Sequence, residues 1–239
     1  MNNYIGIWKA YQSFATTAVV RRKGFELAGM TEKTDDTVPD IADSFRLHGE
    51  SDLEHQAKVA WLALVFLRTF WTVPNIDVYP FVVVALCHDV GEIKIGDIPD
   101  NGNPLHDSKD LLEREVFEEM ARQAFPSCER VIKMFTQFQD RENFGLAICA
   151  LDKLEAALMQ LLCEKHGNGG SIDSGNATDQ DRALMRFTGT TATADVWAAR
   201  MCLRTRGFPD WVKSPVLKLL DTAVCDVRGT SFSWWQKIE

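Results

Sequence analysis

The sequence lacks an excess of basic charge, a membrane-length apolar run and closely paired cysteines. Its net charge of −8 argues against a nucleic-acid polymer as partner, because such binders carry a basic patch. The most apolar stretch, 59–71, is too short to cross a bilayer and contains Arg68. The six cysteines include no CxxC pair, which is typical of free thiols in a reducing compartment. No secretory signal is visible at the start. We therefore expect a cytoplasmic protein that binds neither a membrane nor a nucleic-acid polymer.

Apolar residues at helical spacing are abundant. They predict helices over 54–70 and 144–165, one capped by Asp107 or Ser108, and one starting at Ser214-Pro215. By periodicity alone, the apolar stretch 77–87 could be a buried strand. Its helical neighbours and a proline suited to a first turn favour a helix. Because no alternating strand pattern persists, we expect an all-α fold.

A chain of 239 residues is long enough to bury a large core in one domain. We expect residues 1–239 to form a single all-helical domain whose core spans about 45–165. Residues 1–44 would be an N-terminal helical extension, and residues 183–239 would be C-terminal helices of uncertain role. The stretch 166–181 is rich in Gly, Ser, Asn and Asp and predicts a mobile loop. Four acidic residues predict a solvated helix face. They are Glu113, Glu115, Glu118 and Glu119.

A run of nitrogen and oxygen donors, His88-Asp89-Val90-Gly91-Glu92, directly follows the apolar segment, and Gly91 permits the chain to turn there. His55 lies upstream and Asp152 lies downstream, each in a helical pattern. Asp152 lies one turn after Ile148, on or beside an apolar stripe, where burying an unpaired charge costs several kcal/mol or more. A divalent cation is one partner that offsets this cost. Two imidazoles and two carboxylates suit Mn, Fe, Co, Ni, Zn or Mg, with a position open for water.

Glu92 follows Asp89 by three residues, which is about one helical turn. If the helix continues, the Glu92 carboxylate lies near the metal without binding it. A carboxylate in that place is suited to shuttle a proton.

His55, His88-Asp89 and Asp152 resemble the H…HD…D signature of the HD-domain metal-dependent phosphohydrolases. The resemblance is closest to the 5'-deoxynucleotidase branch. Segment 50–55 (ESDLEH) is similar to the E-S/N-V-x-E/D-H motif of that branch. Segments 88–92 (HDVGE) and 96–99 (GDIP) are similar to its HDxxE and GD(I/L)P motifs. Segment 152–155 (DKLE) is similar to its second-Asp helix, and the resemblance covers roughly residues 45–160.

This resemblance implies an HD-domain helical bundle with the metal site in its helix core. It implies one divalent metal ion per chain, held by His55, His88, Asp89 and Asp152. It also implies that metal-activated water hydrolyses a phosphoester, with Glu92 handling a proton of the water or of the leaving oxygen.

Substrate contacts follow from the same resemblance. Asp97 would face the substrate and accept a hydrogen bond from a sugar hydroxyl. The phosphate-holding cation upstream of segment 50–55 would be Arg46 or a protonated His48, and arginine suits two-point phosphate contact. Apart from the resemblance, Lys153 could be a surface charge, could neutralise Asp152 or Glu155, or could touch phosphate.

The leading functional hypothesis is a phosphomonoesterase acting on (deoxy)nucleoside 5'-monophosphates. One alternative is a phosphodiesterase or pyrophosphohydrolase of a signalling nucleotide, although the few clustered cations favour a substrate with one phosphate. A second alternative is a di-iron HD-type oxygenase, which needs further ligands and has His106 as the nearby candidate. A third is a non-catalytic binding module. The expected partner is a small phosphorylated molecule, and the resemblance suggests a homodimer.

Overall fold

The computed structural model of the chain describes residues 4–5, 7–8, 52–71, 76–91, 106–125, 128–167, 169–172 and 177–235. Within these ranges the protein contains eight helices and no strand, which confirms the all-α prediction. The helices are α3 (Asp52–Thr69), α4 (Val78–Cys87), α6 (His106–Ala124), α7 (Cys128–Gln139), α8 (Gly145–Lys165), α9 (Asp179–Thr188), α10 (Thr193–Thr205) and α11 (Asp210–Arg228).

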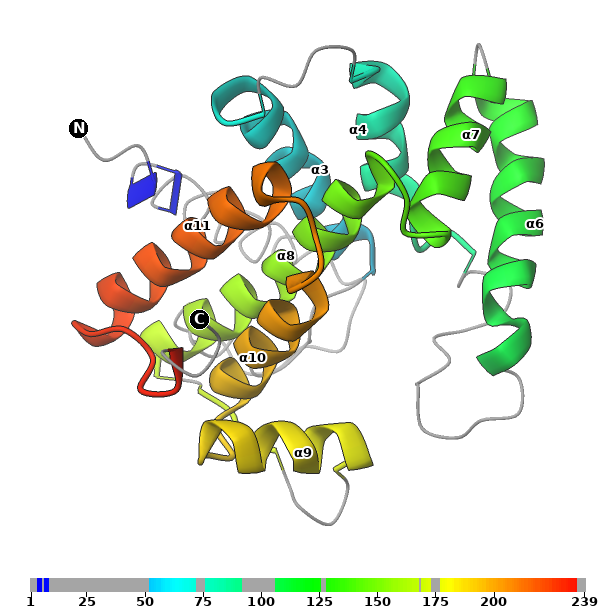
Figure 1. Cartoon of the computed structure of the whole chain (residues 1–239). Coiled ribbons are helices and arrows are strands. Elements are labelled where there is room, and N and C mark those ends of the chain that lie inside the picture. The colour runs from blue at the N-terminus through cyan, green and yellow to red at the C-terminus, as the bar shows by residue number, and fades with distance from the viewer. Residues whose placement is uncertain are drawn as a thin grey trace, which may run out of the picture.

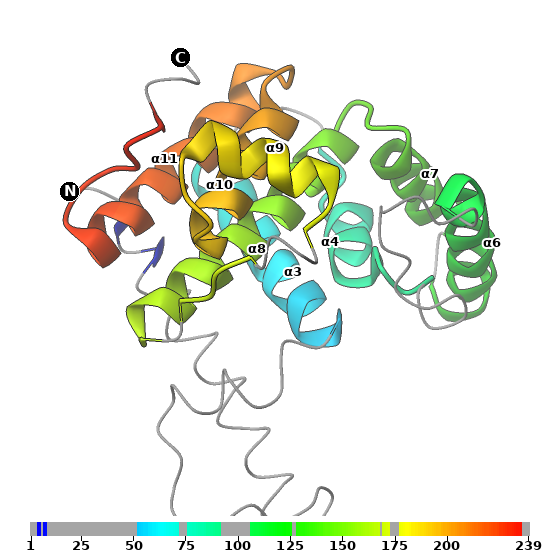
Figure 2. The ribbon, with the colours of Figure 1, turned by 90° about the horizontal axis from the view of Figure 1, so that it is seen from below.

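Helix α8 lies at the centre of the described bundle (Figures 1 and 2). It packs against α3, α4 and α7 on one side and against α10 and α11 on the other. Side chains around most of its circumference are buried, as expected for a helix with neighbours on several sides. A functional group on α8 is therefore held by packing on both sides.

The predicted central helices agree with the structure. Helices α3 and α8 cover the apolar stretches 54–70 and 144–165 to within a few residues. The ambiguous stretch 77–87 is the helix α4, and Pro80 lies in its first turn, where a missing backbone N–H costs little.

Two predicted helix starts are wrong. Helix α6 begins at His106, so Asp107 and Ser108 lie inside its first turn instead of capping it. Helix α11 begins at Asp210 after an extended Pro209, and Pro215 lies inside the helix. An internal proline removes one backbone hydrogen bond. The helix continues across it because Val212, Val216 and the residues that follow bury an apolar face.

The buried apolar side chains of the described residues, apart from Ala177, form one cluster that extends from Ile7 to Trp234. Trp8 is fully buried, and its indole N–H donates to Asp226 of α11 at 2.9 Å.

The predicted loop 166–181 is shorter than expected, because α9 begins at Asp179 and Thr178 caps it. Among the described residues, we find no helix with the length and apolar character of a membrane span.

Candidate metal centre

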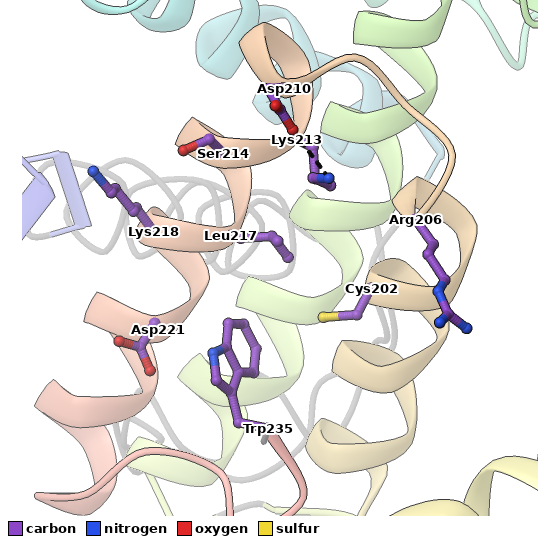
Figure 3. A pocket seen from close by; sticks show the side chains of 9 residues that line it. All are labelled: Cys202, Arg206, Asp210, Lys213, Ser214, Leu217, Lys218, Asp221 and Trp235. Carbon is purple, nitrogen blue, oxygen red and sulfur yellow. Dashed lines mark ion pairs between the residues drawn. The ribbon is translucent and has the colours of Figure 1, made fainter. Parts of the chain in front are cut away.

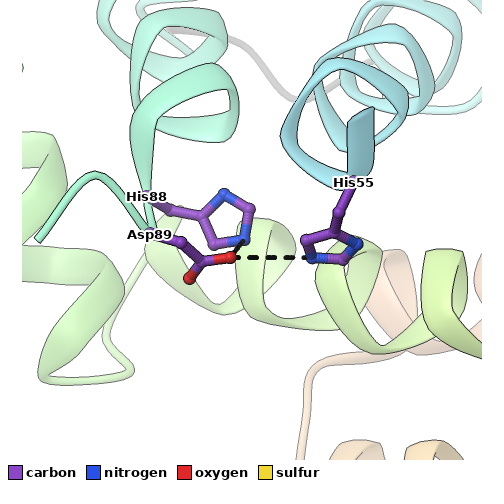
Figure 4. Close-up of side chains that lie close together, drawn as sticks. All are labelled: His55, His88 and Asp89. Carbon is purple, nitrogen blue, oxygen red and sulfur yellow. Dashed lines mark ion pairs between the residues drawn. The ribbon is translucent and has the colours of Figure 1, made fainter. Parts of the chain in front are cut away.

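Three helices bring the predicted ligands together. His55 lies in the first turn of α3, whereas His88 and Asp89 lie in the turn that directly follows α4. Asp152 lies in the second turn of α8, which passes behind the other three residues in Figure 4. One ligand atom each from His55, His88 and Asp89 lies within 4.8 Å of the others. Residues that are 33 and 34 positions apart in the sequence thus converge on one point.

Both imidazoles present Nε2 to the same carboxylate oxygen. Asp89 Oδ2 lies 3.2 Å from His88 Nε2 and 3.9 Å from His55 Nε2 (Figure 4). Asp152 contacts the cluster through His55, because its Oδ1 lies 3.2 Å from His55 Nε2. The four predicted ligands therefore form one connected group of two nitrogens and two carboxylates.

The surroundings of His88 fit a metal ligand. The ring is 1% exposed, and its Nδ1 lies 3.0 Å from the carbonyl oxygen of Ala85, to which an Nδ1–H donates. Nε2 is buried and has no hydrogen-bond partner, although Asp89 Oδ2 is only 3.2 Å away. A buried polar atom without a partner is costly and rare. His88 Nε2 and Asp89 Oδ2 are therefore close to each other without forming a hydrogen bond. Two ligand atoms of one metal ion are arranged in this way. The donor set therefore fits a divalent cation.

Asp152 is held as a carboxylate. Burial raises its pKa, but the positive charges of Lys153, His55 and His88 outweigh burial and bring the pKa below its ordinary range. Lys153 Nζ lies 2.8 Å from Oδ2, whereas Oδ1 faces His55. One oxygen is thus occupied by a lysine and the other is directed at the cluster. The prediction that Asp152 is a ligand remains a prediction.

His55 sits between two carboxylates. Its Nδ1 lies 2.6 Å from Oε2 of Glu155, and its Nε2 faces Asp152. Burial lowers the pKa of His55, but the hydrogen bonds to Asp152 and Glu155 outweigh burial and raise the pKa to about 11. The negative charge around this ring is the kind of field that attracts a cation. The sequence places Glu155 in the DKLE segment beside Lys153, but no motif indicates its contact with His55.

Gly91 allows the turn after α4 to approach α6. A Cβ atom at this position would lie 2.7 Å from Cα of Glu113 and 2.6 Å from its Cγ. Glu113 is correspondingly 9% exposed, which corrects the prediction that this residue belongs to a solvated helix face. Burial raises the pKa of Glu113 and the negative charge of Asp89 adds to the rise, whereas Lys109 opposes it. The other predicted members of that face, Glu115, Glu118 and Glu119, are exposed or half-buried.

Several predicted site residues lie outside the described residues. They are Arg46, His48, Glu92 and Asp97, together with the side chain of His106. Lys153 is described, and its side chain is 31% exposed beside Asp152. The predictions for substrate contact and proton transfer therefore remain predictions.

A cavity of about 550 Å³ lies away from these residues, between α10, α11 and the segment that follows α11 (Figure 3). Arg206, Lys213 and Lys218 line it together with Asp210, Asp221 and Trp235. Lys213 pairs with Asp210 at 3.1 Å. None of the predicted metal ligands lines this cavity.

The described helices and the His-His-Asp cluster define an all-helical protein with a candidate metal site. The comparison with known families gives the class. The HD domain family matches residues 42–184, which is more than half of the chain, and the chain belongs to this family. HD domains typically bind divalent metals, and membership suggests a metal-dependent phosphohydrolase. The matched segment contains all four predicted ligands. Searches of the curated proteins and of the solved structures found no match.

Proposed function

We propose that the protein is a phosphomonoesterase that hydrolyses (deoxy)nucleoside 5'-monophosphates with the help of one divalent cation. The observation that carries the metal-dependent part is the convergence of His55, His88 and Asp89, with the buried Nε2 of His88 lacking a hydrogen-bond partner. The sequence motifs of segments 50–55, 88–92 and 96–99 support the choice of substrate.

His55, His88, Asp89 and Asp152 would hold the cation. When bound, a divalent cation supplies a Lewis acid that polarises a phosphoryl oxygen and lowers the pKa of water. Glu92, which directly follows Gly91 in the sequence, takes the proton of the attacking water or returns one to the leaving oxygen.

Binding of the substrate is assigned to the remaining residues. Asp97 accepts a hydrogen bond from the sugar, and Arg46 or a protonated His48 holds the phosphate. Lys153 is a partly exposed cation beside Asp152 and can contribute to the same phosphate contact.

The charges near the site support a substrate with one phosphate. Lys58, a second cation near the cluster, is 2% exposed and faces Glu155, so it is directed away from a substrate. A nucleoside triphosphate carries several more negative charges and would need accessible cations in addition to Lys153 and the upstream Arg46 or His48.

The test is a phosphate-release assay over nucleoside mono-, di- and triphosphates, cyclic dinucleotides and simple phosphoesters, with Mn, Co, Mg, Ni and Zn each supplied. We expect the highest kcat/KM for 5'-monophosphates, and no release after removal of the metal with a chelator. Release from triphosphates or phosphodiesters in preference to monophosphates would overturn the substrate assignment. Release from no compound with any metal would favour the non-catalytic binding module.

A further inference from the structure

Glu155 is a buried acidic residue to which neither the predicted ligand set nor the predicted substrate contacts give a role. It lies on α8 three residues after Asp152, and its side chain is 0% exposed. Its Oε2 lies 2.6 Å from Nδ1 of His55, a residue 100 positions earlier in the sequence. A carboxylate removed from water to this degree needs hydrogen-bond or charge partners.

The contact with Glu155 determines which nitrogen of His55 faces the cluster. With Nδ1–H donating to Glu155, Nε2 is the atom directed at Asp152 and Asp89. His88 shows the same arrangement, since its Nδ1–H donates to the Ala85 carbonyl and its Nε2 faces Asp89. Both rings are therefore held from behind at Nδ1. Metal-binding histidines are commonly oriented by an acceptor on the second ring nitrogen in this way.

Lys58 holds the other oxygen of the same carboxylate. Its Nζ lies 3.6 Å from Glu155 Oε1 and 3.4 Å from the sulfur of Met159, and the side chain is buried. Lys58 and His55 are both on α3, three residues apart, so they face the same part of α8. The carboxylate is thus fixed at both oxygens between two groups of one helix.

Stability alone does not account for this group. Replacing a buried ion pair with well-packed apolar residues is often neutral or stabilising, because removing charges from water is costly. Apart from Glu155, the side chains of α3 and α8 that are 0% exposed are apolar, with Val59, Leu62 and Leu158 among them. A charged group at this place is explained by what it does to His55.

We propose that Glu155 is a positioning residue for the metal centre, which fixes the tautomer and orientation of His55 and strengthens Nε2 as a ligand, with Lys58 holding the carboxylate in place. The proposal rests on the metal-binding part of the proposed function. It does not depend on which phosphoester is hydrolysed.

The test measures the dissociation constant for Mn²⁺ or Co²⁺ by competition with a chelating dye, together with the thermal midpoint of each metal-stripped protein. Glu155→Gln keeps the size of the side chain and removes its charge. We expect its affinity for metal to fall about 10- to 100-fold, the range typical for lost orienting partners. The control Glu164→Gln, on the same helix, removes a carboxylate that pairs with Arg228. It lowers the thermal midpoint and leaves the affinity for metal within about twofold.

A double variant, Glu155→Gln with Lys58→Met, separates positioning from folding. It removes the lysine charge that Glu155→Gln alone leaves buried, so the thermal midpoint rises toward that of the parent. The affinity for metal stays low if Glu155 acts through His55. An affinity for metal that recovers together with the thermal midpoint in the double variant would overturn the proposal. An affinity of Glu155→Gln for metal within twofold of the parent would also overturn it.

A parent protein that binds no divalent cation would overturn both this proposal and the metal-dependent function. A parent that binds metal but releases no phosphate would overturn the function alone.

Discussion

The guanidinium of Arg228 forms a two-point contact with the carboxylate of Glu164, in which Nε and Nη2 each lie 2.6 Å from one oxygen. The same Nη2 lies 2.7 Å from Asp195, which also accepts the indole N–H of Trp234 at 2.8 Å. The pair of oxygens on Glu164 and the nearby Asp195 hold the pKa of Arg228 above its ordinary value. One arginine therefore joins α11 to α8 and to α10.

Arg228→Lys should lower the free energy of unfolding by about 1–3 kcal/mol, because an ammonium cannot reproduce a planar two-point contact and Asp195 is buried. Chemical denaturation followed by circular dichroism measures the change. Lys213→Gln is the control, since Lys213 pairs with a largely exposed Asp210, and we expect a change below about 0.5 kcal/mol. Equal changes in the free energy of unfolding of the two variants would show that the Arg228 contact contributes no more to stability than an exposed ion pair.

Gly91→Ala should destabilise the protein by about 1–3 kcal/mol, because the added methyl group meets the backbone of Glu113 and the turn or α6 must shift. Since the same turn carries His88 and Asp89, the affinity for metal should fall as well. Thermal unfolding and metal titration measure the two effects. Gly207→Ala serves as the control, because no heavy atom beyond the neighbouring residues in the chain lies within 4 Å of a Cβ placed there. A Gly91→Ala protein with parental stability and metal affinity would contradict this assignment.

Asp181 makes a further, pH-dependent prediction. Burial raises the pKa of this carboxyl, but hydrogen bonds from Thr178 and the contact with Arg200 outweigh burial and lower it from the ordinary value of 3.8. A carboxyl with a lowered folded-state pKa adds stability above its unfolded pKa, and this contribution is lost as the pH falls through the folded value. Asp181→Asn should therefore cost about 1 kcal/mol near pH 7 and progressively less below about pH 4.

Denaturation curves from pH 2.5 to pH 7 test this prediction for Asp181. Asp179→Asn is the matched control, because the Asp179 side chain is 99% exposed in the same helical turn. A difference between the parent and Asp181→Asn that stays constant over the whole range would refute it.

The number of bound metal ions separates the hydrolase from the di-iron alternative. We expect one divalent ion per chain by elemental analysis, since the described ligand atoms converge on one point. Saturating metal at about 100 times its dissociation constant should stabilise the fold by about 2.7 kcal/mol. Two iron atoms per chain would contradict the single-ion prediction.

Substitutions of Glu92 and Asp152 are predicted to have different effects on metal affinity and turnover. Glu92→Gln should keep the affinity for metal and lose turnover, because the proposed role of Glu92 is proton transfer. Asp152→Asn should lose both, because a neutral amide is a weaker ligand for a divalent cation. Metal titration together with kcat at saturating substrate distinguishes these outcomes. Full activity in Glu92→Gln would remove that residue from the mechanism.

The sequence predicted the helices with the strongest apolar periodicity and failed where tertiary contacts decide. The prediction for α8 was correct because apolar residues recur at helical spacing over its whole length. The start of α11 was wrongly predicted at Ser214-Pro215. The helix begins earlier and continues through Pro215, because packing of the residues around it outweighs one lost backbone hydrogen bond. Glu113 was expected in solvent, since no local pattern shows that a glycine 22 positions earlier lets another segment cover it.

The candidate site shows the same division. The order His55, His88-Asp89, Asp152 was visible because motif spacing is a property of the chain. The role of Glu155 was not visible, since its partner His55 is 100 residues away and the pairing depends on how α3 meets α8. A carboxylate three residues after a predicted ligand, on the same face of a buried helix, is the signal that could have indicated it.

The HD domain match ends at residue 184, inside α9, whereas α8 has its most extensive packing against α10 and α11. Residues 42–184 therefore do not include α10 and α11, the two helices that bury one side of α8. A protein shortened to the matched residues would retain every predicted ligand and yet expose one long side of the helix that carries Asp152 and Glu155. Expression of the isolated family segment should accordingly give an insoluble or weakly folded product, and biochemical work on this centre needs the chain through at least Trp235.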